Sequence, residues 1–163
     1  MRVAVISDIH DNIWHLETAL RKTHEEKAEV LLVLGDFCAP FTLAQIGDGF
    51  SGAIHAVFGN NDGDTFLLTT IASKYAQVTL HGHLGELELD GKKIAINHYP
   101  DIAERLADSG AYDAVFSGHD HKKYQERRGE TLWANPGEIM GRFGEPSFGL
   151  YETGSGHFRH INL

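Results

Sequence analysis

The sequence contains little cysteine and no long apolar run. Cys38 is the one cysteine among 163 residues, which excludes an internal disulfide and is typical of a reducing compartment. No apolar stretch approaches the roughly 20 residues that a membrane-spanning helix needs. The first apolar run breaks at Asp8, so the start of the chain favours a β-strand over a signal peptide. We therefore expect a cytoplasmic protein that does not associate with membranes.

Basic residues are also scarce. The chain has 14 Lys and Arg residues against 23 Asp and Glu residues, which gives a formal net charge of −9. Such a surface repels nucleic acid at long range, so a nucleic-acid polymer is not the expected partner. A small anionic substrate remains compatible with this charge if the site supplies a local cation.

No linker divides the chain into parts. Its 163 residues match the size of one ordinary domain, and no Pro-rich or Ser-rich stretch interrupts them. Hydrophobic residues make up 42% of the chain, which is enough for a buried core. We expect a single domain over residues 1–163. The sequence leaves the oligomeric state open, and a homo-oligomer is compatible with it.

Short apolar runs alternate with amphipathic segments in the first half. Residues 2–7, 30–34 and 53–58 are typical of buried strands. Helices are expected after Asn12, a good N-cap residue, and around residues 64–74. Strand, helix and strand in this order indicate a parallel sheet with right-handed crossovers.

Shorter strands dominate the second half, which looks more antiparallel. A hairpin is expected around Asp90-Gly91, because this dipeptide favours a tight turn between strands. The expected strands are 84–89, 92–97, 114–117, 123–128, 131–134, 148–152 and 157–163, with a helix at 102–109. Two mixed β-sheets packed as a sandwich, with helices outside, accommodate both halves in one α/β fold.

Polar residues with metal-binding or catalytic chemistry follow five of these apolar runs. They are Asp8, His10, Asp36, Asn60, Asn61, His98, His119 and His121. Ligands of parallel α/β sheets bind beyond the carboxyl ends of the strands, so these side chains are expected at one edge. Any one of these pieces alone is more often a turn or a hydrogen-bonded residue. Five of them together favour a shared site.

The residue types at this edge suit divalent metal ions. Carboxylate, amide and imidazole ligands without a thiolate favour Mn²⁺, Fe or Zn²⁺. Seven candidate ligands are too many for one ion and fit two ions that share one carboxylate. Two ions about 4 Å apart can hold a phosphoryl group and activate water.

The motifs Asp-x-His, Gly-Asp, Gly-Asn-x-Asp, a later His and Gly-His-x-His stand in this order over the whole chain. Together they resemble the calcineurin-like metallophosphoesterase superfamily. The short length and the GHDH…NPG ending resemble its small YfcE-type phosphodiesterase family. The resemblance implies a four-layer α/β/β/α fold, and hydrolysis of a small phosphodiester by a hydroxide that bridges two metal ions.

The resemblance also implies a role for each candidate residue. Asp8, His10 and His121 would hold one ion, Asn60, His98 and His119 would hold the other, and Asp36 would bridge them. Asp36, Asn60 and Asn61 are the expected catalytic residues. Mn²⁺ is the first expected metal, with Ni²⁺, Fe²⁺ and Zn²⁺ as alternatives.

Position 61 departs from the family pattern, because many members carry a histidine there that protonates the leaving group. The neutral amide of Asn61 cannot act as a general acid, and we expect it to donate a hydrogen bond to a phosphate oxygen. Asp62 is expected to brace the loop, and Asn135 to support the site. The sequence leaves two other functions open: a non-catalytic protein-binding scaffold on the same fold, and a phosphomonoesterase.

The histidines at 81 and 83 are a possible second metal site. No carboxylate stands beside them in the sequence, and they precede the hairpin at Asp90-Gly91. We therefore interpret them as loop histidines.

Overall fold

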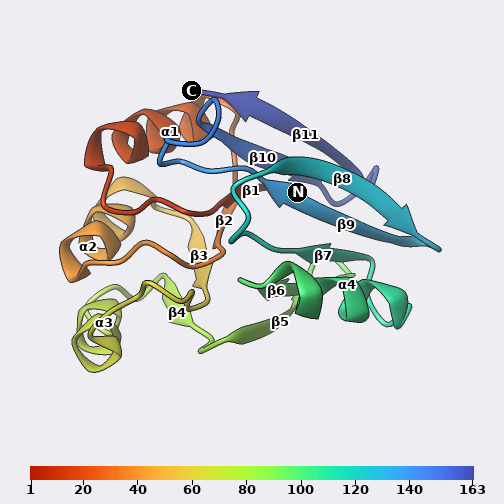
Figure 1. Cartoon of the computed structure of the whole chain (residues 1–163), viewed down its shortest axis with the longest axis horizontal. Helices are drawn as coiled ribbons and strands as arrows, with labels where there is room; N and C mark the ends of the chain where they lie inside the picture. The colour runs from red at the N-terminus through yellow and green to blue at the C-terminus, as the bar shows by residue number, and fades with distance from the viewer.

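The computed structural model describes residues 1–163 and contains two β-sheets and four helices (Figure 1). The helices are α1 (Ile13–Glu25), α2 (Pro40–Gly49), α3 (Thr65–Ala72) and α4 (Pro100–Asp108). The strands are β1 (Arg2–Ile6), β2 (Val30–Val33), β3 (Ala53–Ala56), β4 (Val78–Leu80), β5 (Leu84–Leu89), β6 (Lys92–Asn97), β7 (Ala114–Phe116), β8 (Lys123–Arg128), β9 (Thr131–Pro136), β10 (Ser147–Glu152) and β11 (His157–Asn162).

The first sheet has six strands in the order β11-β10-β1-β2-β3-β4. The pairs β1–β2, β2–β3 and β3–β4 are parallel, as the alternation of strands and helices predicts. The C-terminal hairpin β10–β11 joins this sheet by pairing antiparallel with β1. The last strands of the chain therefore lie beside the first one.

The second sheet has five strands in the order β5-β6-β7-β9-β8. Its outer pairs β5–β6 and β8–β9 are antiparallel hairpins, and Asp90 and Gly91 turn the first of them with positive φ angles of 54° and 74°. Its inner pairs β6–β7 and β7–β9 are parallel. The second half is therefore less antiparallel than the sequence suggests, because α4 provides a crossover between β6 and β7.

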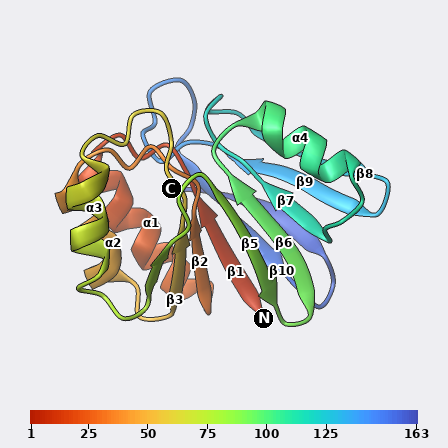
Figure 2. The same ribbon diagram turned by 90° about the horizontal axis from the view of Figure 1, so that it is seen from below.

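The two sheets pack face to face between outer layers of helices (Figure 2). Side chains of both sheets meet in the middle, where Val5 and Leu32 of the first sheet share a cluster with Ile96 and Phe116 of the second. Helices α1, α2 and α3 cover the outer face of the first sheet, and α4 covers the second. The predicted four-layer α/β/β/α architecture is confirmed.

Capping residues and a proline in the sequence predict where three of the four helices begin. Asn12 accepts a hydrogen bond from the His15 backbone N–H, and Asp64 accepts one from Leu67, so both residues cap the helices that follow them. Pro100 stands in the first turn of α4, where its missing N–H does no harm.

Helix α2 and strand β4 were missed by the sequence prediction. No side chain of the preceding residue Ala39 caps α2. Instead, the Asp11 carboxylate accepts hydrogen bonds from the Ala39 N–H at 2.9 Å and the Thr42 hydroxyl at 2.6 Å. The capping residue Asp11 is distant in the sequence, so no local sequence pattern predicts the start of α2. Strand β4 is three residues long and too short for a periodic signal. None of the four helices combines the length and the apolar character that a membrane span requires.

Candidate metal centre

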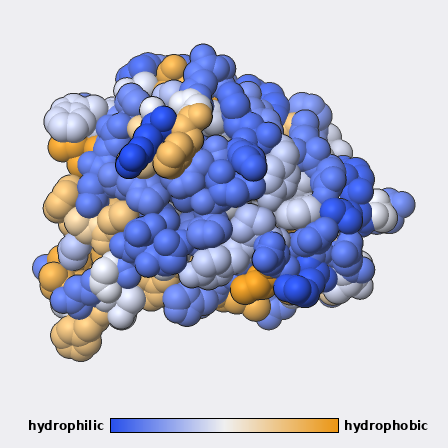
Figure 3. All heavy atoms as spheres, in the orientation of Figure 1, coloured by the Kyte–Doolittle hydropathy of each residue, from blue (hydrophilic) through white to orange (hydrophobic).

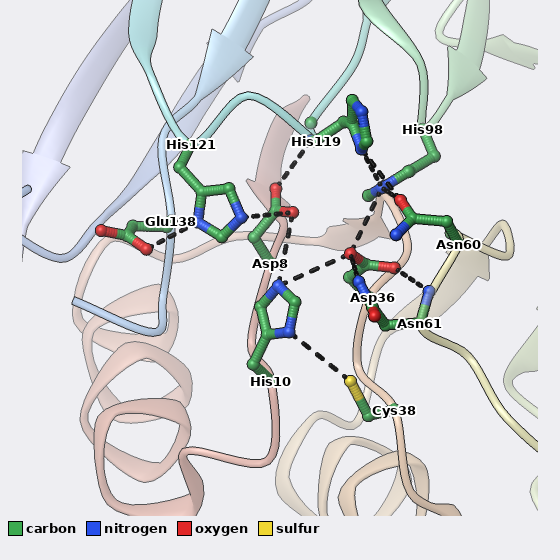
Figure 4. A network of polar contacts seen from close by, with 12 residues as sticks. Asp8, His10, Asp36, Cys38, Asn60, Asn61, His98, His119, His121 and Glu138 are labelled. Carbon is green, nitrogen blue, oxygen red and sulfur yellow. Dashed lines mark hydrogen bonds and ion pairs between the residues drawn. The ribbon is translucent and has the colours of Figure 1, made fainter. Parts of the chain in front are cut away.

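The seven candidate ligands predicted from the sequence come together at one edge of the sandwich (Figure 4). Asp8 and His10 follow β1, Asp36 follows β2, Asn60 follows β3, His98 follows β6, and His119 and His121 follow β7. Both sheets therefore contribute side chains. The carboxyl ends of their parallel strands meet at this edge, which is where α/β folds bind ligands.

One group of side chains surrounds Asp8. Its Oδ1 atom lies 3.8 Å from His10 Nε2 and 3.5 Å from His121 Nε2. The imidazole rings of these two histidines stack with centroids 5.2 Å apart. These three side chains are close enough to hold one metal ion.

A second group surrounds Asn60 and His98. Asn60 Oδ1 lies 3.1 Å from His98 Nε2 and 2.9 Å from His119 Nδ1. Asp36 Oδ2 lies 3.4 Å from His98 Nε2 and also 3.5 Å from His10 Nε2. One oxygen of Asp36 therefore faces both groups, and this carboxylate is only 1% exposed.

The spacing of these atoms fits metal coordination. Ligands about 2.1 Å from one ion lie roughly 3.0–3.4 Å from one another, which is close to the separations within both groups. Asp8 Oδ1 and His10 Nε2 are buried and have no hydrogen-bond partner. Unpaired buried polar atoms are rare in folded proteins, and atoms that serve as metal ligands are a common reason for them. The residues present therefore fit divalent ions.

Backbone strain is concentrated in the same loops. Nine non-glycine residues have positive φ angles, and five of them are candidate ligands: Asp8, His10, Asp36, His119 and His121. The left-handed conformation costs an ordinary residue roughly 1–2 kcal/mol. Such strain persists where the surrounding structure enforces it, and it is typical of functional sites.

Hydrogen bonds on the far side of the imidazoles orient two of the histidines. His98 Nδ1 lies 2.7 Å from the Leu34 carbonyl oxygen, and His121 Nδ1 lies 2.6 Å from Glu138 Oε2. Each Nδ1 therefore carries the proton and donates it, which leaves the Nε2 lone pair facing the site. Glu138 is buried and was not predicted from the sequence. Its position directly after the Asn-Pro-Gly turn was the only available signal.

Two other predicted supporting residues hold the loops. The Asp62 carboxylate accepts hydrogen bonds from the backbone N–H groups of Asp36, Cys38 and Gly59 at 2.7–2.9 Å, so it braces the loops after β2 and β3. Asn135 Nδ2 donates to the Gly118 carbonyl oxygen at 2.9 Å, next to His119. Both residues act on the backbone that carries the ligands.

Asn61 lies beside Asp36. Its backbone N–H donates to Asp36 Oδ1 and its side-chain amide donates to Asp36 Oδ2, each at 2.8 Å. Burial alone raises the pKa of the Asp36 carboxyl, but hydrogen bonds from His98 and Asn61 outweigh burial and hold this pKa well below its usual range. Asp36 is therefore ionised at neutral pH, as a metal ligand must be.

Cys38 lies beside the centre but does not fit its chemistry, and His55 and His81 lie outside it. Cys38 Sγ is 3.7 Å from His10 Nδ1, and burial together with the Asp11 charge raises the pKa of the Cys38 thiol to about 12. A protonated thiol is a poor nucleophile. His81 pairs with His55 at 3.0 Å between ring nitrogens, and neither belongs to a group of metal-binding side chains.

Comparison with known families decides what kind of protein carries this centre. The sequence pattern of the calcineurin-like phosphoesterase superfamily domain matches residues 1–156. The chain belongs to the calcineurin-like phosphoesterase superfamily. The protein is therefore a phosphoesterase of a family that uses divalent metal ions, as the motifs predict.

Individual relatives support the same placement. The phosphoesterase is 29% identical to phosphodiesterase MJ0936 of Methanocaldococcus jannaschii, over 100% of this chain and 99% of that protein. The solved structure of an archaeal phosphodiesterase, also 29% identical, superimposes with a TM-score of 0.93 over the full length of both chains. The structure of YfcE, a phosphoesterase from E. coli, gives a TM-score of 0.70 at 17% identity over the full length of both chains. The two relatives at 29% identity are phosphodiesterases, and the likeness to YfcE concerns the fold.

Vps29 of Entamoeba histolytica, solved with Zn²⁺, has the same fold. Its TM-score is 0.67 at 16% identity, over 100% of this chain and 98% of that one. At this identity the likeness concerns the fold alone, so the function must be argued from the site.

The stability of the metal-free phosphoesterase is expected to fall as pH rises above about 6.5, the ordinary pKa of histidine. The Asp8 carboxylate raises the pKa of His10. Burial lowers the pKa of His98, but Asp36 outweighs burial and raises it. A raised folded-state pKa stabilises the protein below the unfolded value of about 6.5, and this stabilisation is lost as pH passes the folded value.

Bound metal should reverse this trend, because metal needs neutral imidazoles and its affinity therefore grows with pH. The melting temperature is to be measured at several pH values with a chelator and with excess Mn²⁺. His55 and His81 do not produce this fall, because burial lowers their pKa values and a lowered histidine pKa makes stability rise with pH. Parallel curves with and without Mn²⁺ would contradict the assignment of His10 and His98 as ligands.

Proposed function

We propose that this phosphoesterase is a phosphodiesterase that binds two divalent metal ions at the candidate centre, with Mn²⁺ as the first expected metal. The observation that carries the proposal is the position of Asp36. One buried carboxylate oxygen lies 3.5 Å from His10 Nε2 and 3.4 Å from His98 Nε2, between two sets of ligand atoms. A shared carboxylate is the arrangement that two neighbouring ions need.

The ligand set explains how an acidic protein attracts a phosphate anion. Two divalent ions, when bound, supply water activation and neutralise charge on the phosphate oxygens. Asp8 and Asp36 contribute two negative charges, and Asn60 and the imidazoles contribute none. The carboxylates therefore do not cancel the metal charge, and the centre stays positive within a chain of net charge −9.

Position 61 supports a diester substrate with a good leaving group. An amide cannot donate a proton to a departing alkoxide, so no general acid stands at this place. The Asn61 amide lies beside Asp36 and can donate a hydrogen bond to a phosphate oxygen from there. This contact would orient the phosphoryl group without taking part in proton transfer.

Aromatic rings on both sides of the centre support a substrate with two ester groups. Tyr99 lies against His98 and His119, with ring centroids 5.1 and 5.3 Å apart. Phe143 lies against His121 on the other side, with centroids 5.1 Å apart. A phosphodiester has an organic group for each side, whereas a monoester has only one.

The proposal is tested by removing all metal and restoring one ion type at a time. The reloaded protein is assayed with bis-p-nitrophenyl phosphate and p-nitrophenyl phosphate, which share one leaving group. We expect about two Mn²⁺ ions per chain and faster cleavage of the diester. Faster cleavage of the monoester with Mn²⁺, Ni²⁺, Fe²⁺ and Zn²⁺ alike would make the protein a phosphomonoesterase. Metal binding without any hydrolysis would favour the scaffold function.

A further inference from the structure

The loop between β9 and β10 is fixed against the metal centre. The Ile139 N–H donates to the Ser7 carbonyl oxygen at 3.0 Å, and the Met140 N–H donates to the Asp8 carbonyl oxygen at 2.9 Å. Asn12, which caps α1, donates from Nδ2 to the Met140 carbonyl oxygen at 2.9 Å. These hydrogen bonds therefore fix the position of the loop relative to the backbone of Asp8.

Glu138 connects this loop to a candidate ligand. One of its carboxylate oxygens bonds His121 Nδ1 at 2.6 Å, and the other accepts the backbone N–H groups of Phe143 and Gly144 at 2.6 and 2.8 Å. The ring of Phe143 meets the His121 imidazole edge to face, at an interplanar angle of 83°. The buried Glu138 carboxylate thus holds both the candidate ligand His121 and the backbone of Phe143.

Phe143 is 69% exposed although its loop is held at both ends. Other exposed aromatic side chains, Trp14, Phe41 and Phe66, stand in the first turns of α1, α2 and α3, where hydrophobic side chains gather on that side of the molecule (Figure 3). None of these three forms a ring contact with a candidate ligand. Phe143 is therefore distinguished by its contact with His121.

Arg142 covers Phe143 and has no other partner. Its guanidinium carbon lies 5.3 Å from the centre of the Phe143 ring. Every other arginine of the chain forms an ion pair or a side-chain hydrogen bond within the protein: Arg2, Arg21, Arg105, Arg127, Arg128 and Arg159. The Arg142 guanidinium is thus a planar cation whose hydrogen-bond donors are unpaired within the chain.

None of the main hollows of the surface is lined by a candidate ligand. The main hollows of the surface lie elsewhere, for example beside Arg127 and Phe158 of β8 and β11, and between α1 and α2. An organic group next to His121 must therefore be held by side chains that project from the surface. Phe143 and Arg142 are placed to do so.

We propose that Phe143 and Arg142 bind the organic group of the substrate on the His121 side, and that this group is planar and aromatic, such as an aryl group or a nucleobase. The proposal rests on the function proposed above and specifies its substrate class. Stacking on an exposed aromatic ring is favourable for any planar π system. A guanidinium plane stacks on the same kind of group and remains charged at all relevant pH values.

The test is the binding of two non-hydrolysable phosphonates to the Mn²⁺-loaded protein, measured by calorimetry. Phenylphosphonate and methylphosphonate present the same anionic group to the metal centre and differ in the planar ring. We expect the wild-type protein to bind phenylphosphonate about 10-fold more tightly. Phe143→Ala should reduce this ratio to about 1–2, and Arg142→Lys, which keeps the charge but loses the plane, should reduce it partly.

Two controls make the result specific. Phe66→Ala removes a ring of α3 that is 83% exposed and contacts no candidate ligand, so it should leave the ratio unchanged. Phe143→Leu keeps an apolar side chain against His121, and Mn²⁺ titration of each variant checks that the metal centre is intact. If the preference for phenylphosphonate disappears in Phe143→Ala and weakens in Phe143→Leu, the assignment is supported, even if the protein does not cleave diesters. A ratio near 1 in the wild type, or an unchanged ratio in Phe143→Ala, overturns it even if diesters are cleaved.

Discussion

Replacing Asp36 with asparagine is expected to lower kcat/KM for bis-p-nitrophenyl phosphate by about 10³-fold or more. Asp36 is the one carboxylate with an oxygen within 3.5 Å of an imidazole nitrogen in each of the two ligand sets. An amide keeps the shape but not the charge, so it cannot bridge two cations. The bound metal should fall from about two ions per chain to one or none, as measured by elemental analysis of the purified variant.

Two further variants separate this effect from a general loss of stability. Asp113→Asn makes the same chemical change at the surface, where Asp113 pairs with Lys92 at 2.9 Å, and should keep both ions and full activity. Asp8→Asn should mainly release the ion held with His10 and His121, because the Asp8 carboxylate lies against the imidazoles of that group and bonds the second group only through the backbone N–H of His119. If Asp36→Asn retains two ions, Asp36 is not a shared ligand and the binuclear proposal fails.

Replacing Asn61 with histidine is expected to accelerate hydrolysis of diesters with alkyl leaving groups by about 10²–10⁴-fold. An imidazolium at this position can protonate a departing alkoxide, which the amide of Asn61 cannot do. A nitrophenolate leaving group hardly needs a proton, so bis-p-nitrophenyl phosphate should gain little. The measurement is kcat/KM for a matched pair of diesters that differ only in the leaving group, over a range of pH.

The contact of Asn61 with Asp36 calls for a control in this experiment. The Asn61 amide donates to Asp36 Oδ2 at 2.8 Å, so any substitution also removes this hydrogen bond. Asn61→Ala removes the hydrogen bond without adding an acid, and its effect should be the same for both leaving groups. The gain in Asn61→His should decline as pH rises and the histidine loses its proton. Equal effects of Asn61→His on both substrates would mean that residue 61 supports Asp36 and does not face the leaving group.

The order of residue types along the chain predicted that these side chains would lie together at one edge of the fold. Asp8, Asp36 and Asn60 each follow an apolar run, and the structure places all three at the ends of parallel strands. The hairpin at Asp90-Gly91 and the cap at Asn12 were predicted for the same reason. These are local features, because a strand, a tight turn or a helix start depends on residues within a few positions.

Features that depend on distant residues were not predictable in this way. Helix α2 is capped by Asp11, which lies 28 positions before Ala39 in the sequence. Glu138 orients His121 from 17 positions away, and the same carboxylate holds the backbone of Phe143. Each contact forms only after the chain has folded, so no periodicity or spacing in the sequence reports it.

The sequence by itself determined which chemistry the candidate centre offers: carboxylate, amide and imidazole side chains without a thiolate, collected just after apolar runs. Only the tertiary structure decided their geometry. It brings His98 and His119, which follow strands of the second sheet, against Asp36 and Asn60, which follow strands of the first. The distance between these two pairs of residues is set by the packing of the sheets. The apolar side chains between the sheets are buried in one core, and their burial fixes the relative position of the strand ends.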